Sequence, residues 1–198
     1  MSRGGRRPGE SGTRAAVLAT ARESFGMRGY GATSVRGVAR TAGVDPSLVL
    51  HFFGSKDGLF AAAIELPFDP AEVVSGLLAG GADGLGERIV RTFVTVWDAS
   101  PGQGPMLAML RSAVSHEDAA AMLRELLLRV MLRPLAVGAG GSDPDLRAAL
   151  LASQVVGLAI SRYVLRLEPV TSASADRLAP LLGPTLQRYL TGELPSQA

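Results

Sequence analysis

Cysteine is absent from this 198-residue chain, which removes disulfides, thiolate metal sites and cysteine nucleophiles from consideration. Histidine is scarce, because only His51 and His116 are present and neither lies in a cluster of metal-ligand residue types. No apolar run reaches the length of a membrane span, and residues 1–12 are rich in Arg and Gly without the apolar stretch of a signal peptide. We therefore expect a cytoplasmic protein with no membrane contact, no metal and no cofactor.

What the chain does contain is apolar material at helical spacing. Hydrophobic residues make up 47% of the sequence, which is enough for a packed core and argues against a largely disordered chain. No stretch alternates polar and apolar residues, so an all-α fold is predicted. Capping residues and breakers predict a first helix over 13–28, a second that Thr33 and Ser34 can cap and that Gly43 closes, and further helices over 46–53, 56–66, 71–79, 86–99, 103–115, 117–136, 143–167 and 174–191.

Charge is distributed unevenly along the chain. Residues 1–60 hold nine basic and four acidic side chains, a net charge of +5, whereas the remainder holds eleven basic and fourteen acidic ones, a net charge of −3. A basic head on a mildly acidic body fits a phosphate-binding module joined to a sensing or dimerising module. Three of the nine basic residues lie within the first seven positions, so a solvated tail is an alternative explanation for part of the asymmetry.

The segment between the second and third predicted helices has the features of a helix-turn-helix. This unit needs a small residue where its helices cross and a residue that tolerates positive φ in the turn, and Ala39 and Gly43 meet these needs. The residues placed to bury against Phe25 and the first helix are Val38, Val44, Val49 and Phe53. The residues left on the outer face of the third helix, which would enter the major groove of DNA, are Ser47, Leu48, Leu50 and His51.

The segment TSVRGVARTAGVDPSLVLHFFGSK, from Thr33 to Lys56, resembles the TetR family of bacterial one-component regulators. The approach to it matches the family as well, with Phe25, Gly29 and Tyr30 before Thr33, and the PFDP junction at 67–70 is similar to that of some actinobacterial members. The resemblance is specific over residues 13–66. With the helix pattern it implies a disordered Arg/Gly-rich tail over 1–12, a three-helix helix-turn-helix DNA-binding domain over 13–55, a connecting helix over 56–66, and a larger helical regulatory and dimerisation domain over 67–198.

The resemblance also implies roles for single residues. Ser34 and Arg36 would contact phosphates or bases, and Lys56 would clamp a phosphate. The residues that would face base edges are Pro46, Ser47, Leu48 and His51. Family members usually carry Thr where Leu48 stands and Tyr where Leu50 stands. Because leucine forms no side-chain hydrogen bond, we expect methyl contact with thymine or looser docking at these two positions.

The helix predicted over 143–167 carries small residues four apart, a pattern that permits another helix to approach closely. The stripe consists of Ala149, Ser153, Gly157 and Ser161, with Leu150 beside it. The leucines of the last helix that we expect to join it in a four-helix interface between two subunits are Leu178, Leu182 and Leu186. The family resemblance implies the same homodimer. Packing of the stripe against a helix of its own chain is the alternative.

The middle helices carry Met and aromatic residues where the resemblance implies a ligand pocket. The candidate lining residues are Phe93, Trp97, Met106, Met109, Leu110, Met122 and Met131, with Arg111 or Gln154 as polar groups that could orient a ligand. The same residue types at helical spacing are also typical of an ordinary core. The ligand itself is not identified beyond a small apolar molecule.

These features predict a regulator rather than an enzyme. The expected mechanism is a dimeric repressor that binds a pseudo-palindromic operator in double-stranded DNA and is released by its ligand. Enzyme function lacks support, because Ser115, His116 and Glu117 are consecutive and so do not face one another on a helix. An architectural DNA-binding protein is the other alternative, and it predicts little sequence preference and no response to a ligand.

Overall fold

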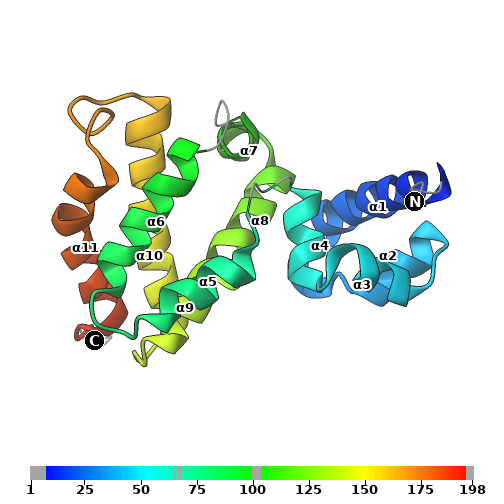
Figure 1. Ribbon diagram of the computed structural model, residues 1–198, viewed down its shortest axis with the longest axis horizontal. Helices are drawn as coiled ribbons and strands as arrows, with labels where there is room; N and C mark the ends of the chain where they lie inside the picture. The colour runs from blue at the N-terminus through cyan, green and yellow to red at the C-terminus, as the bar shows by residue number, and fades with distance from the viewer. Residues whose placement is uncertain (1–7, 65, 67, 100–103, 195–198) are drawn as a thin grey trace, which may run out of the picture.

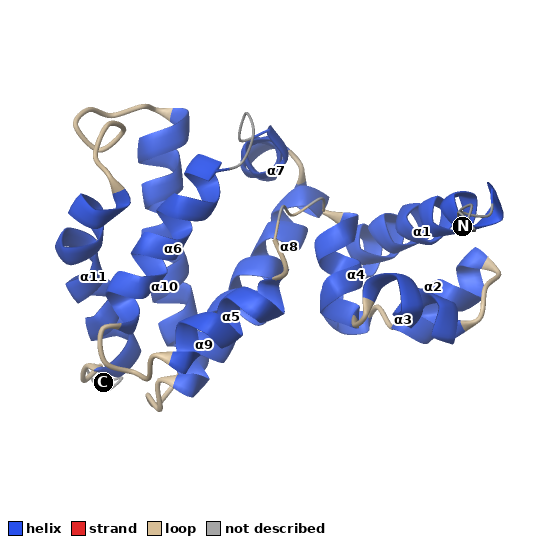
Figure 2. Cartoon of the chain, in the orientation of Figure 1, coloured by secondary structure: helices blue, strands red, loops and turns tan. Residues whose placement is uncertain are grey.

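The computed structural model describes residues 8–64, 66, 68–99 and 104–194, apart from the side chains of 8–10, 104–106, 108, 109 and 118. Within these residues the protein is built from helices and loops, as Figures 1 and 2 show. The helices form two groups at opposite ends of the molecule, a smaller one that contains the N-terminus at the right of Figure 1 and a larger one at the left. The all-helical architecture predicted from the sequence is therefore confirmed. The N-terminal group comprises α1 (Pro8–Ala32), α2 (Val35–Ala42), α3 (Pro46–Phe53) and α4 (Lys56–Ala63).

Local side-chain caps set the limits of the short N-terminal helices. The Ser34 hydroxyl accepts a hydrogen bond from the N–H of Gly37 at 3.0 Å at the start of α2, and Gly43, with φ of 70°, closes that helix. Thr33 does not share the capping role. Its buried hydroxyl donates to the carbonyls of Ser24 and Gly29, each at 2.9 Å, and so fixes the end of α1 to the turn that follows.

The first helix begins earlier than predicted. It starts at Pro8 rather than Thr13, so residues 8–12, expected in a disordered tail, are helical. A proline fits the first turn of a helix, because the N–H that it lacks would have no partner there. The interruption predicted near residue 29 is present, because Gly29 has φ of 73° and ψ of 170°.

The C-terminal group surrounds its own apolar core. Two of its helices, α6 (Leu85–Ala99) and α11 (Ala175–Thr191), approach closely where Gly86 faces Gly183. A Cβ on Gly86 would lie 2.2 Å from the carbonyl oxygen of Gly183. The Gly86 N–H donates to the Gln187 side chain at 3.0 Å across the same contact. The elements of this group are α5 (Pro70–Ala79), α6 (Leu85–Ala99), α7 (Gly104–Ser115), α8 (Glu117–Glu125), η2 (Leu126–Leu132), α9 (Arg133–Gly138), α10 (Pro144–Ala159), η3 (Ile160–Val164) and α11 (Ala175–Thr191).

The helix predicted over 117–136 changes its geometry half-way along. It is α-helical in α8, π-helical in η2 and α-helical again in α9. Pro134 lies two residues after the end of η2, and a proline in a helix interior removes the hydrogen bond to the carbonyl four residues earlier and clashes with it. The wider π turn relieves this conflict without ending the helix.

Candidate functional site

The outer face of α3 is exposed as the sequence predicts. Val49 is buried in the N-terminal core, while Ser47 and His51 are exposed on the opposite side and Leu48 is half-buried. Leu50 is 45% exposed, which is a large exposed fraction for a leucine on a short helix. The helix therefore offers solvent one hydroxyl, one imidazole and a leucine side chain.

The loop before α3 fixes the orientation of Ser47. Asp45 accepts hydrogen bonds from the Ser47 N–H at 2.8 Å and from the Ser47 hydroxyl at 2.5 Å. These two hydrogen bonds lower the pKa of the Asp45 carboxyl from its usual value. Since the Ser47 proton is directed to Asp45, its oxygen lone pairs are free to accept a hydrogen bond from outside.

Lys56, at the start of α4, lies over an aromatic ring. Its ammonium nitrogen is 4.0 Å from the ring centroid of Tyr30, and the Tyr30 hydroxyl donates to Asp57. The pKa of Lys56 is lowered, because partial burial outweighs the opposite effect of the negative charges of Asp57 and Glu125. The role of Tyr30 in placing this lysine was not predicted from the sequence.

Further basic side chains surround the outer face of α3. Arg36 and Arg40 are exposed on α2. The Arg14 guanidinium lies 5.0 Å from the ring centroid of Phe53, so a charge on α1 is held next to the end of α3. With Lys56 at the start of α4, basic side chains lie on all three of the helices α1, α2 and α4 that pack against α3.

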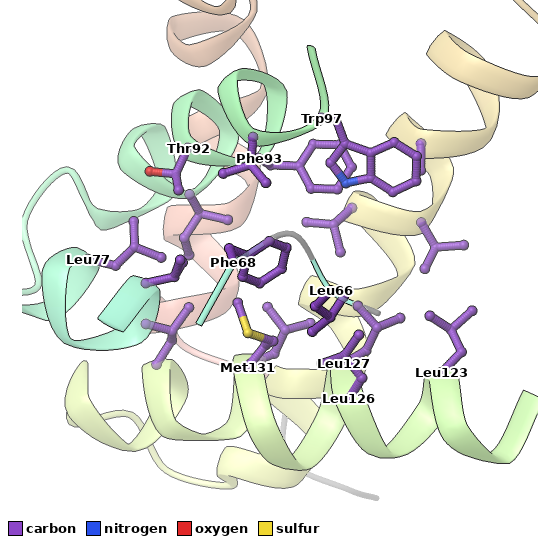
Figure 3. Close-up of a pocket in the computed structure, with 18 of the residues that line it drawn as sticks. Leu66, Phe68, Leu77, Thr92, Phe93, Trp97, Leu123, Leu126, Leu127 and Met131 are labelled. Atoms are coloured by element: carbon purple, nitrogen blue, oxygen red, sulfur yellow. The ribbon is translucent and has the colours of Figure 1, made fainter. Parts of the chain in front are cut away.

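The C-terminal group contains a partly open apolar cavity of about 120 Å³ (Figure 3). Its wall is formed by the connection after α4 and by α5 to α10. The described residues that line it are Leu66, Phe68, Val73, Leu77, Ile89, Thr92, Phe93, Val96, Trp97, Leu110, Leu123, Leu126, Leu127, Met131, Leu132, Leu135, Val155, Val156 and Ala159.

The predicted pocket residues divide into three sets. Those that line the cavity are Phe93, Trp97, Leu110 and Met131. Met122 and Gln154 do not line it, and the prediction is wrong for both: Met122 packs against the N-terminal core, and the Gln154 amide donates to the Ser153 hydroxyl. Arg111 is exposed and does not line the cavity either. The side chains of Met106 and Met109 fall outside the part of the chain that the structure describes.

A polar cluster of buried Arg162 and Tyr163 with the exposed Asp98 holds Trp97 at the edge of the cavity. The indole stacks on Tyr163 with ring centroids 4.7 Å apart. The Tyr163 hydroxyl donates to Asp98 at 2.9 Å, and Arg162 donates to the other oxygen of the same carboxylate at 2.8 Å. Burial and then the hydrogen bond to Asp98 raise the pKa of Tyr163 above its usual value, so this phenol stays protonated.

The cavity wall and the N-terminal core share three residues. Leu66, Leu126 and Met131 line the cavity and also pack against the cluster that contains Phe25 and Phe60. Two of them belong to the π-helical segment η2, which continues from α8, and α8 runs beside the N-terminal helices (Figure 1). Part of the cavity wall thus belongs also to the core that supports α3.

Comparison with known proteins agrees with this arrangement. The family pattern "Bacterial regulatory proteins, tetR family" matches residues 17–63, and "Tetracyclin repressor-like, C-terminal domain" matches residues 83–190, more than half of the chain. The chain belongs to the TetR family. A TetR-family regulator from Streptomyces coelicolor A3 is 42% identical, with 94% of this chain and 99% of that chain covered and a TM-score of 0.46. The HTH-type transcriptional regulatory protein RaaS of Mycobacterium tuberculosis is 28% identical over 93% of this chain and 88% of its own length.

Membership of the TetR family gives this protein its general activity. It is a DNA-binding transcriptional regulator and belongs to a non-enzymatic family. Among the residues that the structure describes, no helix is long and apolar enough to cross a membrane. Over the same residues, no three His, Asp or Glu side chains come together in a way that could hold a metal ion.

The small-residue stripe of this TetR regulator faces solvent on α10. Ala149, Ser153 and Gly157 are exposed, Ser161 and Leu150 are half-buried, and a Cβ on Gly157 would meet no atom within 4 Å. The alternative of packing within its own chain therefore fails for the exposed part of the stripe.

The leucines predicted to accompany the stripe are placed differently. Leu178 and Leu186 are only 5% and 2% exposed, and they pack with Leu182 into the core of their own chain. Their prediction as partner-facing residues is wrong because α11 turns this row toward α6. The leucine that α11 presents to solvent is instead Leu181, which is 66% exposed.

Proposed function

We propose that this TetR regulator is a homodimeric repressor that binds a pseudo-palindromic operator and leaves it when a small apolar molecule fills the cavity. The observation that carries the proposal is the shared position of Leu66, Leu126 and Met131 between the cavity wall and the core beneath α3. Because protein interiors are close-packed, a ligand that moves these side chains alters the support of the reading helix.

In this proposal α3 enters the major groove and reads bases. Ser47 accepts a hydrogen bond from a cytosine or adenine amino group, since Asp45 holds its proton, and His51 contacts a neighbouring base edge. Leu48 and Leu50 contact thymine methyl groups. Pro46 starts the helix at the groove edge. Residues 13–55 serve as the reading unit, and 56–66 join it to the regulatory part over 67–198.

In the same proposal the surrounding polar residues contact the DNA backbone. Lys56 clamps a phosphate from its position over the Tyr30 ring, and Ser34 and Arg36 approach a second phosphate at the start of α2. Phosphate contacts set affinity and its salt dependence rather than sequence preference. The two sets of residues therefore predict separable effects on binding.

Dimerisation is proposed through the solvent-facing stripe on α10 and the exposed face of α11 around Leu181. Exposed small residues permit close approach of a second copy, and exposed leucines supply apolar area. Two reading helices related by a two-fold axis would then require two half-sites on the DNA. The operator is accordingly expected to be symmetric.

The proposal is tested by selecting bound sequences from random double-stranded DNA with the purified protein. We expect enrichment of a symmetric sequence with two half-sites about one helical turn apart. A His51→Ala variant should shift the preferred bases within each half-site while it binds random DNA as before. Selection without any sequence preference would contradict the proposal and would favour an architectural DNA-binding role.

A further inference from the structure

The cavity of this protein is unusual in that almost nothing in its wall can bind a charge or a hydrogen-bonding group. Of the nineteen described residues that line it, eighteen are hydrophobic and none is acidic or basic. Two lining side chains carry a polar group, the Thr92 hydroxyl and the Trp97 indole N–H, and Figure 3 shows the Thr92 hydroxyl pointing away from the other labelled side chains. An anion in this space would lose its hydration shell and gain no partner, and a cation would exchange its hydration shell for contact with aromatic ring faces alone.

The charged groups nearest to the aromatic end of the cavity are already paired. Asp98, next to Trp97 in the chain, accepts hydrogen bonds from Arg162 and from Tyr163. Arg162 also donates to the Ala173 carbonyl at 2.8 Å, so its guanidinium already has partners on both the carboxylate and the backbone. Breaking these bonds for a ligand would leave buried polar groups unpaired. The cluster thus holds Trp97 in place and offers a ligand nothing.

The dimensions and the aromatic residues limit the ligand further. A cavity of about 120 Å³ is close to the roughly 150 Å³ of an engineered apolar cavity that stays dry and binds benzene. Phe93 and Trp97 stand with ring centroids 5.4 Å apart at one end, and Phe68 lies between them and Met131 in Figure 3. Aromatic rings of this kind favour offset or edge contacts with another ring.

We infer that the cavity selects an uncharged, single-ring aromatic molecule with little or no hydrogen-bonding capacity, and that it rejects cations and anions of the same shape. This inference rests on the proposed function only in treating the cavity as the effector site. It deepens that proposal by naming the chemical class of the effector, and it concerns binding to the free protein.

Three probes of nearly equal shape test the inference, namely ethylbenzene, benzyl alcohol and benzylammonium. Trp97 is the only tryptophan in the chain and lines the cavity, so its fluorescence reports occupancy directly. We expect ethylbenzene to bind most tightly and benzylammonium at least about a hundredfold more weakly, with benzyl alcohol between them. Toluene should bind about fourfold more weakly than ethylbenzene, because it buries one methylene group fewer.

Two variants provide controls on the location of the probe. Val156→Phe adds a ring to the wall and should abolish the ethylbenzene response, with circular dichroism used to check folding. Thr92→Val keeps the branched shape of the side chain and removes the hydroxyl, which points away from the other labelled side chains, so it should leave the affinity for both ethylbenzene and benzyl alcohol within about twofold of the original. A loss of benzyl alcohol affinity in Thr92→Val would show that the hydroxyl serves the ligand and would overturn the claim of an apolar-only site.

The outcomes separate this inference from the proposed function. No ethylbenzene response, or equal affinity for benzylammonium, overturns the ligand class whatever the protein does on DNA. If ethylbenzene binds as expected but leaves the affinity for the selected operator unchanged, the ligand class stands and release by ligand fails. Operator binding is measured by fluorescence anisotropy in the absence of ethylbenzene and the other test ligands. A lack of operator binding in that experiment would refute the DNA-binding proposal alone.

Discussion

Replacing Gly183 with alanine should destabilise the protein, although alanine favours a helix more than glycine does. A Cβ at this position would lie 2.5 Å from Cγ, 2.8 Å from Cα and 2.9 Å from the backbone nitrogen of Glu87, so α6 and α11 would have to move apart by about 1 Å to restore ordinary contact. Overpacking of this kind costs about 1–3 kcal/mol, and backbone atoms cannot rotate away, which places the cost near the upper end. The gain of about 1 kcal/mol in helix propensity offsets part of it.

The expected net loss is therefore about 2 kcal/mol in the free energy of unfolding, which corresponds to a fall in Tm of about 4–8 °C for a chain of this size. Gly76→Ala on α5 is the matched control, because its Cβ would meet no atom within 4 Å, and it should raise stability by about 0.5–1 kcal/mol. Urea unfolding followed by circular dichroism measures both variants. Equal or greater stability of Gly183→Ala would refute the close helix contact on which the placement of α11 depends.

Three further outcomes follow from the geometry. Lys56→Ala should weaken binding to every DNA sequence and lower the slope of log affinity against log salt by about 0.9 per subunit, measured by anisotropy between 50 and 200 mM salt; an unchanged slope would contradict the phosphate contact. Gly157→Leu should raise the dimer dissociation constant at least about tenfold in sedimentation experiments with no loss of monomer stability, and an unaltered dimer would remove α10 from the interface. Asp45 has a lowered pKa in the folded state. Its contribution to the stability of the fold is therefore present above the unfolded-state pKa near 3.9 and is lost as the pH falls through the lower folded-state pKa. Asp45→Asn keeps the cap without this titration, so acid unfolding below about pH 4 should show a smaller fall in stability for the variant than for the original protein.

The reading head could be predicted from the sequence because its signals are local. Ser34 caps α2, Gly43 adopts positive φ in the turn and Pro46 begins α3, and each of these lies within a few residues of the structure that it determines. The exposed face of α3 follows from helical periodicity once Val49 is buried. Tyr30 was missed as the support of Lys56 because the two are 26 positions apart and meet only after α1 and α4 pack together.

The regulatory half was harder to predict because its decisive contacts are non-local. The leucine row of α11 faces inward because Gly183 fits against Gly86, almost a hundred positions earlier, and no local pattern distinguishes a row that packs on its own chain from one that packs on a partner. The cavity depends on what packing leaves unfilled, so Phe93 and Trp97 could be proposed from their type while Leu66 and Phe68 in the connection could not. The exposure of the α10 stripe was likewise visible only after the rest of the core had been placed.

The coupling in the proposed mechanism needs only a small structural difference between the two forms of the dimer. A tenfold weaker operator affinity with ligand bound corresponds to about 1.4 kcal/mol of coupling, and linkage requires the ligand to bind the operator complex more weakly by the same factor. Burial of one methylene group contributes about 0.8 kcal/mol, so a change in burial of two such groups is sufficient.

Leu126 and Met131 offer these groups, because both touch the cavity and the N-terminal core, and both belong to η2. Each hydrogen bond of a π-helix spans one more residue than a hydrogen bond of an α-helix. Conversion of η2 to α-helix would therefore rotate these side chains relative to the core without unfolding the helix. The proposed mechanism therefore requires two packings of the segment between the cavity and the reading head, because a ligand changes DNA binding at a distance only by favouring one of two states.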